Sequence, residues 1–515
     1  MPDQFSHAPR FYRFVRVFFL FCTLILCASL ALCSLVVTTY FPESYDEIPQ
    51  YSCSSFLPVL ICCGIFFALS AWVLPHCKKI SRCGIILFAC LFVFVFGGLW
   101  AFFNNTMPTA DRIFIYQNAQ NLLIGDYSLL QPGAYFSQFP YQLATSLWAA
   151  LVMKLFGAGH CFFAFQLFNA FFAALLVYFL LRLTELFNPD KKALCLAAFL
   201  CIAFYPIALL STFIYGTLAS AAFSVRALFF ALRATDSGKI RFYTGSALCI
   251  MLAMLAKPNS AVFLVGLALL FLTAALHRKS VRPVLGLAAC VILALGAGEL
   301  LLFIMEQRSG YDLHNGETFW AWIAMGLQTG PLAPGWYNEY NDMLYVLHQF
   351  DNDAIAQQAI ASIGTSLAEF CSHPSYALHF FGLKTISQWC EPTYATFWIS
   401  KNALTDQLAP NWIQACYAGP VHDGLVLWAD ALQTLLYTGA AAALWNRRKN
   451  WRAEYLIPVL VVFGGFVFHT FWEAKSLYII NYSVLLVPYA ALGLCDISCF
   501  ISRYLCKKRK SKANP

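Results

Sequence analysis

The chain has 515 residues, of which 60% are hydrophobic, 17% aromatic and only 11% charged. A typical soluble domain has about 25% charged residues, so these values exclude a water-soluble protein. Repeated apolar runs of about 20 residues predict an all-α polytopic membrane protein instead. The net charge of +8 is clustered along the chain in a way that indicates membrane topology, so nucleic acid is not an expected partner.

Twelve membrane spans are predicted in chain order. The first follows Arg10, Arg13 and Arg16, and its apolar run is longer than the roughly 7–15 residues of a signal peptide, which favours a retained helix. The spans are expected at 15–38, 56–74, 83–103, 160–183, 193–211, 212–233, 242–256, 259–276, 283–305, 425–445, 456–472 and 478–498.

The basic residues predict the orientation of these spans. They form seven clusters, at 10–16, 78–82, 182–192, 233–241, 278–282, 447–452 and 503–512. With twelve spans, all seven clusters and both termini face the cytoplasm. A further crossing at the short apolar stretch 143–156 would place every later cluster outside. This stretch is therefore predicted to lie along the outer interface.

The same topology places the long segment 306–424 outside the membrane. It contains eleven acidic residues against three basic ones, and six of the thirteen tryptophans. Structureless loops of this length are uncommon, so we expect short helices packed on the outer surface. Four regions are predicted: 1–82 with a cytoplasmic tail and two spans, 83–305 with an outer loop at 104–159, the extracytoplasmic region 306–424, and 425–515 with three spans and a basic cytoplasmic tail.

Three groups of polar residues near the predicted outer ends of spans are candidates for chemistry. Asp111 either serves the first turn of a helix or acts as a general base. Lys257, between two apolar runs, either snorkels to the interface or faces a bound phosphate. His469, Glu473 and Lys475 form either an aromatic-belt ion pair or a site for an anionic lipid headgroup.

Other chemistries have less support in the sequence. Most of the 20 cysteines lie in apolar runs, where they act as small hydrophobes, and no zinc-binding spacing occurs. The sequence has no P-loop, Rossmann fingerprint, GxSxG or HExxH motif. Arg226, Glu299 and Asp430 lie in predicted spans, but the sequence names no partners for them.

Together, four stretches resemble the GT-C glycosyltransferases. This superfamily of polyprenyl- or dolichyl-phosphate-sugar-dependent enzymes includes protein mannosyltransferases and lipid A aminoarabinose transferases, and the resemblance is closest to its Gram-positive, family 39-like branch. The matching residues are Asp111 with 125–128, 139–142 and 154–157; 255–259; 325–327 with 335–338; and 472–475 with Tyr478, Pro488 and Gly493.

The resemblance implies a GT-C-like bundle with interfacial helices in its first outer loop, to which the first two spans are additional. It implies sugar transfer from a polyprenyl-phosphate donor to an acceptor hydroxyl on the extracytoplasmic face, with inversion. Asp111 would be the general base, although Arg112 stands where many relatives have a second acid. Lys257 and Lys475 would stabilise the leaving phosphate, and Arg112 ranks below them as a candidate for this role. Trp336 and Tyr337 would stack on sugars. Glu473, His469, Tyr141 and Gln142 are the remaining expected substrate-binding residues.

Several questions stay open at the level of sequence. Some relatives use a divalent metal ion, but no ligand set is evident in this chain. The sugar is not identified, and the acceptor can be a protein, a teichoic acid, a glycolipid or a polysaccharide. A transporter and a lipid-linked polysaccharide ligase or polymerase are the alternative functions. The absence of an internal repeat and the concentration of polar groups at the outer face favour the transferase over the transporter.

Overall fold

The chain is an all-α, multi-pass membrane protein. The computed structural model describes residues 10–42, 47–53, 56–77, 79–405 and 409–513, without the side chains of 76–77 and 501–513. Lys78 and the basic side chains of 503–512 therefore lie outside the described part. Nine described helices are long and apolar enough to cross a membrane: α1 (Arg10–Val36), α2 (Phe56–Cys77), α3 (Arg82–Asn104), α7 (Cys161–Phe187), α10 (Thr217–Ser237), α12 (Ala261–Arg278), α13 (Arg282–Ser309), α21 (Ala453–Phe471), and α22 (Ser476–Ser483) continued by η5 (Val484–Leu486) and α23 (Val487–Ala513).

Three of the twelve predicted spans differ from simple crossings. Stretch 193–211 is broken into α8 (Lys191–Ala203), α9 (Pro206–Leu209) and η3 (Leu210–Thr212), with a bend of 49°, because Pro206 has no N–H to continue the helix. Helix α11 (Ile240–Ala256) has 17 residues, which rise about 26 Å, less than the hydrocarbon core. Helix α20 (Pro420–Asn446) contains Asp423 and Asp430 and is not among the spans of the described chain.

The bundle is held by close helix pairs. Helix α10 packs against α7 and α11, α11 packs against α13, and α3 packs against α7. Helices α20 and α23 approach most closely where Gly439 faces Gly493. A Cβ atom added to Gly493 would lie only 1.8 Å from the carbonyl oxygen of Gly439. Small residues allow such backbone contact between membrane helices.

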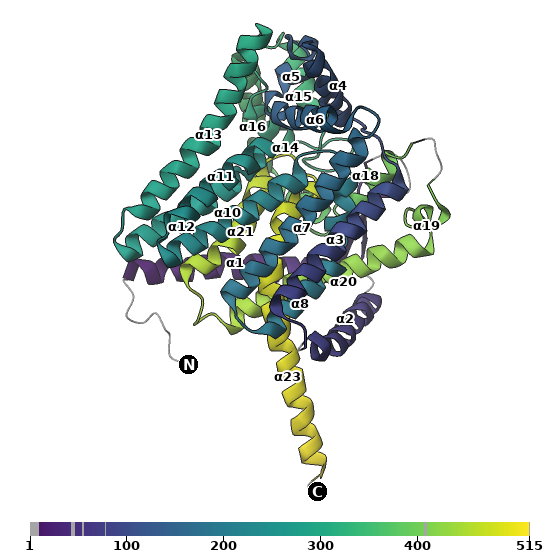
Figure 1. The fold of residues 1–515 in the computed structure, drawn as a ribbon, viewed down its shortest axis with the longest axis vertical. Coiled ribbons are helices and arrows are strands. Elements are labelled where there is room, and N and C mark those ends of the chain that lie inside the picture. The colour runs from purple at the N-terminus through teal and green to yellow at the C-terminus, as the bar shows by residue number, and fades with distance from the viewer. Residues whose placement is uncertain (1–9, 43–46, 54–55, 78, 406–408, 514–515) are drawn as a thin grey trace.

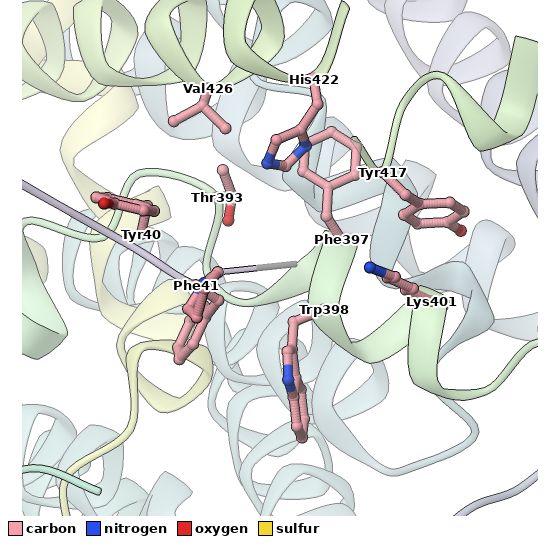
Figure 2. A pocket seen from close by; sticks show the side chains of 10 residues that line it. Tyr40, Phe41, Thr393, Phe397, Trp398, Lys401, Tyr417, His422 and Val426 are labelled. Carbon is pink, nitrogen blue, oxygen red and sulfur yellow. The ribbon is translucent and has the colours of Figure 1, made fainter. Parts of the chain in front are cut away.

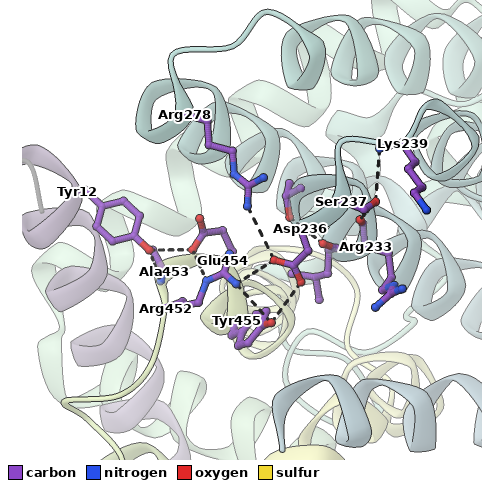
Figure 3. A network of polar contacts seen from close by, with 12 residues as sticks. Tyr12, Arg233, Asp236, Ser237, Lys239, Arg278, Arg452, Ala453, Glu454 and Tyr455 are labelled. Carbon is purple, nitrogen blue, oxygen red and sulfur yellow. Dashed lines mark hydrogen bonds and ion pairs between the residues drawn. The ribbon is translucent and has the colours of Figure 1, made fainter. Parts of the chain in front are cut away.

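A polar network ties the first helix to the bundle (Figure 3). Tyr12 of α1 donates its hydroxyl to Glu454 at 2.8 Å, at the start of α21. Next to it, Arg452 donates to Asp236 of α10 at 2.8 Å, and Tyr455 donates to the other oxygen of Asp236 at 3.2 Å. The hydrogen bond of Tyr12 thus fixes α1 to α21, and α1 also packs on α20.

Short helices gather beside the end of α13, at the top of Figure 1. Loop 104–159, called the first outer loop after its predicted location, supplies α4 (Asp111–Ile124), η1 (Ser128–Leu130), α5 (Tyr135–Gln138), η2 (Pro140–Gln142) and α6 (Leu143–Phe156). Segment 306–424, called the outer segment for the same reason, contains α14 (Phe319–Gly326), α15 (Tyr340–Leu347), α16 (Asn352–Ser372), α17 (Pro374–Trp389), α18 (Thr396–Asn402) and α19 (Asn411–Gln414). Helix α6 has 14 residues and rises about 21 Å, which is too short for a crossing.

The chain between α1 and α2 forms a small antiparallel strand pair. Strand β1 (Val37–Tyr40) pairs with β2 (Gln50–Cys53), with Val37 opposite Cys53. Thr39 donates its N–H to the carbonyl of Cys390 at 2.8 Å, and the Thr38 hydroxyl donates to Asp430 at 2.5 Å. These bonds attach the strand pair to the end of α17 and to α20.

Candidate active site

An extended turn between α21 and α22 carries two charged side chains. Ala474 in its centre donates its N–H to the carbonyl of Gly335 at 2.8 Å, which ties the turn to the outer segment. Because side chains alternate along extended backbone, Glu473 and Lys475 share one side of the turn, while Ala474 packs against Trp336 on the other. The carbonyl of Glu473 accepts from Nδ1 of His469 at 3.2 Å.

Asp111 is the first residue of α4, yet the helix does not use its side chain as a cap. Ala110 occupies the capping position with φ 51° and ψ −137° and makes no side-chain capping bond. Such a positive φ is unfavourable for a residue with a Cβ atom. Among the described residues, no hydrogen bond to the Asp111 carboxylate is recorded. Asp111 therefore does not cap α4, but it does lie in the first turn of that helix, where the helix dipole favours an acid.

The Asp111 carboxyl faces several charges from distant parts of the chain. Its side chain is accessible to solvent, yet enough protein surrounds the carboxyl for desolvation to raise its pKa above the ordinary value. The nearby cation Lys475 opposes this rise, and the acids Asp342 and Glu47 add to it. Asp111 and Lys475 thus share one electrostatic environment although they lie 364 positions apart in the sequence.

Lys257 lies buried between aromatic rings and does not snorkel. It follows α11 and precedes η4 (Pro258–Ser260), and only 7% of it is exposed. Its Nζ lies 4.4 Å from the ring centroid of Tyr478, 5.8 Å from that of Tyr215 and 3.5 Å from the Thr217 hydroxyl. Burial lowers the pKa of Lys257 to about 7, against the opposing charge of Glu473.

Glu473 is a buried carboxyl surrounded by lysines. Burial raises its pKa to about 7, and the charge of Lys475 limits this rise. The Tyr478 hydroxyl donates to its Oε2 at 3.3 Å. Glu473 also raises the pKa of both Lys257 and Lys384, so three lysine side chains lie within its electrostatic reach. Lys475 itself forms an ion pair with Glu47.

The remaining polar residues of the first outer loop border the same space. Arg112 is buried; it donates through Nε to the carbonyl of Thr109 at 2.9 Å and lies 5.0 Å from the Phe213 ring. Gln142 donates to the hydroxyl of Tyr215. The charges of Asp111 and Glu473 both raise the pKa of the Tyr141 phenol, after burial as the main cause.

Two acids of the outer segment join this site, although the sequence analysis did not name them. Gln138 donates to Glu317 at 3.0 Å and to Asp342 at 2.7 Å, and the Tyr337 hydroxyl donates to the second oxygen of Asp342. Burial raises the pKa of Glu317 to about 8. Both acids occur among many in an acidic segment, so no spacing in the sequence distinguishes them.

Lys384 is a third residue that the sequence analysis did not identify as part of the site. It is 1% exposed, and its amine donates to the carbonyl of Trp472 at 2.8 Å and to that of Gly326. These carbonyls stand at the C-terminal ends of α21 and α14, where the helix dipole favours a cation. Lys384 thus joins the outer segment to the turn that carries Glu473.

The predicted stacking role of Trp336 is wrong. Trp336 is 1% exposed, and its indole N–H donates to Ser387 at 2.8 Å, so it has no open face for a sugar. Its neighbour Tyr337 is 38% exposed and keeps an accessible ring. Trp336 instead packs against Ala474, in the centre of the turn between α21 and α22.

The described residues contain one trio that could hold a metal ion by distance. Glu306, Asp312 and His314 bring their ligand atoms within 4.8 Å of one another. Both nitrogens of His314 already face carboxylates, at 2.7 Å from Glu306 and 3.1 Å from Glu299. These contacts explain the trio without a metal. The acids Asp111, Glu317 and Asp342 have the oxygen ligands that hard divalent cations prefer, but they are not gathered in this way.

The arrangement combines one solvent-accessible carboxylate with several enclosed cations. Asp111 can accept a proton because no hydrogen bond from the described part of the chain occupies its carboxylate. Lys257 and Lys475 can bind an anion, since positive charge in a partly desolvated site interacts strongly with phosphate. The tyrosine rings around them offer both apolar faces and hydroxyl groups.

No family model matches the chain, and no curated protein matches it. The solved structures that are similar to it include two from one archaeon. One is the apo oligosaccharyltransferase of Archaeoglobus fulgidus, with 14% identity over 84% of this chain and 52% of that chain and a TM-score of 0.46. The other is AglB of the same organism in complex with an inhibitory peptide and a dolichol-phosphate, with 13% identity, the same coverage and a TM-score of 0.43. The chain spans about half the length of these structures.

Proposed function

We propose that the chain is a membrane glycosyltransferase of the GT-C type. It transfers a sugar from a polyprenyl-phosphate donor to an acceptor hydroxyl at the extracytoplasmic face. The observation that carries this proposal is that Lys257 and Glu473 both contact Tyr478, while the charges of Asp111 and Lys475 both act on Glu473. The resemblance of four sequence stretches to GT-C enzymes points to the same chemistry.

The proposed reaction is a single displacement. The donor enters from the lipid with its phosphate near Lys257 and Lys475. The acceptor oxygen forms a bond to the anomeric carbon while the bond from that carbon to the phosphate oxygen breaks, and the electron pair leaves with the phosphate. Asp111 takes the proton of the acceptor hydroxyl, and its raised pKa makes it a stronger base than an ordinary aspartate. The lysines stabilise the negative charge on the leaving phosphate.

The test is consumption of radiolabelled polyprenyl-phosphate sugars by the purified full-length chain in lipid nanodiscs. We expect Asp111→Asn to lower turnover by about 100-fold or more, because it removes the base and keeps the size of the side chain. The matched control is Asp126→Asn in the same loop. Asp126 accepts from the Ser128 N–H at 2.8 Å, a bond that asparagine can also accept, so its turnover should match the wild type. Full activity in Asp111→Asn would remove the proposed base.

A further inference from the structure

One side of α10 is only partly covered by its neighbours α7 and α11 (Figure 1). Most positions of this helix are buried in the bundle. Those that are not buried recur every three or four residues, and positions with this spacing share one side of a helix. Apart from Asp236 in the last turn, they are Ala219, Phe223, Arg226, Phe230, Arg233 and Ser237. We call these six residues the α10 stripe.

Three arginines lie over a row of aromatic rings at this stripe. The rings are those of Phe179 in α7, Phe230 in α10 and Phe242 in α11, with successive centroids 6.0 Å and 6.1 Å apart. The guanidinium carbon of Arg226 lies 5.5 Å from the first ring and 5.2 Å from the second. Those of Arg233 and Arg241 lie 5.5 Å and 4.9 Å from the third. The row of rings thus connects the middle of α10 with its basic end.

These guanidinium groups have no counter-ion in the described part of the chain. No ion pair there includes Arg226, Arg233 or Arg241, and the Nε atom of Arg226 is enclosed without a hydrogen-bond partner. Asp236, the only acid of α10, is already bound by Arg452 (Figure 3). A guanidinium that stacks on a ring keeps its N–H edge available, so an anion can still bind to it.

The depth of Arg226 places it just beneath the lipid headgroups. Helix α7 has 27 residues and rises about 40 Å, the thickness of a bilayer with its headgroups, so its ends reach the headgroup layer. The two rings beside Arg226 lie eight residues before the end of α7 and seven before the end of α10, which is about 10–12 Å. Because the headgroup layer is about 5–7 Å thick on each side, the guanidinium lies roughly 5 Å inside the hydrocarbon region. An unpaired charge is unfavourable there.

Aromatic rings are used differently in the pocket between β1, α18 and the start of α20 (Figure 2). There Phe397 lies 6.3 Å from Tyr417 and 5.2 Å from the ring of His422, and the remaining space holds about one water molecule. The Nδ1 atom of His422 already lies 2.9 Å from the carbonyl of Cys416. The rings of that pocket therefore pack on one another, whereas the rings beside α10 hold cations that lack an anion.

We propose that the α10 stripe, together with Arg241, binds the headgroup of an anionic phospholipid. Arg233 and Arg241 bind its phosphate in the headgroup layer. Arg226 donates to the ester carbonyl oxygens of the acyl chains, just beneath the phosphate, and the chains pack on Phe223 and Phe230. A partner helix with one buried acid would neutralise Arg226 alone and leave the other two arginines without an anion. The site is separate from the proposed sugar transfer and does not depend on it.

Native mass spectrometry of the full-length protein in detergent measures this binding. The probes are phosphatidylglycerol and phosphatidylcholine with the same acyl chains. We expect the first phosphatidylglycerol to bind about ten-fold more tightly than the first phosphatidylcholine. Arg233→Gln combined with Arg241→Gln should remove this preference, because each arginine near a headgroup contributes about a five-fold gain in affinity. Arg226→Met should weaken both lipids about three-fold, since both have the ester carbonyls.

Arg448→Gln is the matched control. Arg448 is exposed, and its guanidinium also lies over a ring, 4.3 Å from that of Trp445, but outside the α10 stripe. This variant loses the same charge and should keep both affinities. The double variant changes exposed side chains and should unfold at the wild-type temperature in phosphatidylcholine, so that a lost preference reports on binding.

Three results would overturn the proposal. The first is equal affinity of the wild type for the two lipids, and the second is an unchanged preference in the double variant. An equal loss in Arg448→Gln would show general attraction by positive charge instead of a site. A protein partner would be indicated if a synthetic polyleucine helix with one central glutamate bound the wild type but not Arg226→Met, while both bound phosphatidylglycerol equally. That result would also refute the lipid site.

Discussion

At the scale of single residues, the surroundings of Lys257 give its amine an unusually low pKa. Its amine is enclosed by the rings of Tyr215 and Tyr478 and faces the charges of Glu473 and Lys475. Because its pKa is lowered to about 7, the amine is protonated below that pH and neutral above it. A lysine in bulk water would stay charged across this whole range.

Donor binding should therefore weaken as the pH rises through 7. Lys257 loses its positive charge over this interval, while Glu473, whose pKa is raised to about 7, gains a negative one. Both changes disfavour a phosphate. We expect the donor KM to rise about ten-fold between pH 6 and pH 8, the loss of roughly one charge-assisted hydrogen bond. Steady-state kinetics with saturating acceptor measure this rise.

Two variants of Lys257 separate its charge from its size. Lys257→Arg keeps the charge at every pH in this range, so the rise of KM with pH should become shallower and retain only the share of Glu473. Lys257→Met should raise the donor KM about ten-fold already at pH 6. Unchanged kinetics in Lys257→Met would show that this lysine does not contact the donor.

At the scale of elements, Lys384 joins two helix ends that are distant in the sequence. Lys384→Met should lower the free energy of unfolding by about 1–3 kcal/mol, because the buried carbonyls of Gly326 and Trp472 lose their donor. It should also lower turnover, since the turn with Glu473 is no longer fixed to α14. Thermal unfolding and donor consumption are the measurements. Lys154→Met, at an exposed position near the end of α6, is the matched control and should change neither.

The contact between α20 and α23 leaves no space for a side chain. A Cβ atom on Gly493 would lie 1.8 Å from the backbone of Gly439 and 2.8 Å from that of Ala443. Because both contacts are with backbone atoms, no side-chain rotation can relieve them. Gly493→Ala should destabilise the protein by about 3 kcal/mol or more, at or above the upper end for overpacking. In α13, Gly298 has no atom within 4 Å of an added Cβ. Gly298→Ala should therefore leave the unfolding temperature unchanged or raise it slightly, and equal effects of the two variants would contradict this packing argument.

At the scale of the whole molecule, hydrophobic runs predict most of the helices. Nine of the predicted crossings appear among the described residues as helical segments long enough to cross a membrane, since length and apolarity alone determine them. The break at Pro206, the shortness of α11 and the acids of α20 require knowledge of packing, because neighbouring helices satisfy their polar groups. The strand pair between α1 and α2 was not predicted, as its few residues have no regular alternation.

The candidate site was only partly predictable for a similar reason. Asp111, Lys257, Glu473 and Lys475 stand next to apolar runs, and this makes them conspicuous in the sequence. Lys384, Glu317 and Asp342 lie in a polar segment, where an ionisable residue is ordinary. Only the folding of the outer segment over the turn brings them to the site. Trp336 shows the opposite error, because its aromatic character indicated a ligand contact where the fold uses it for packing.

The orientation in the membrane stays a prediction from the basic clusters, and reporter fusions can test it. Alkaline phosphatase fused after residue 159 should be active, because the loop with Asp111 is expected outside. The same reporter fused after residue 238, in the cluster at 233–241, should be inactive and a cytoplasmic fluorescent protein at that point should be bright. Phosphatase activity at 238 combined with inactivity at 159 would invert the molecule and place Asp111 in the cytosol.

The ion pair between Lys475 and Glu47 joins the N-terminal region of the chain to the turn between α21 and α22. Glu47 belongs to the region before residue 82, which the resemblance to GT-C enzymes treats as an extra, and the strand pair holds it against the rest through Thr39 and Cys390. A shortened protein that began at residue 82 would keep every proposed catalytic side chain and still lack the neutralising partner of one lysine. The region before residue 82 is therefore expected to be part of the site. Supplying it as a separate polypeptide should restore the activity that its deletion lowers.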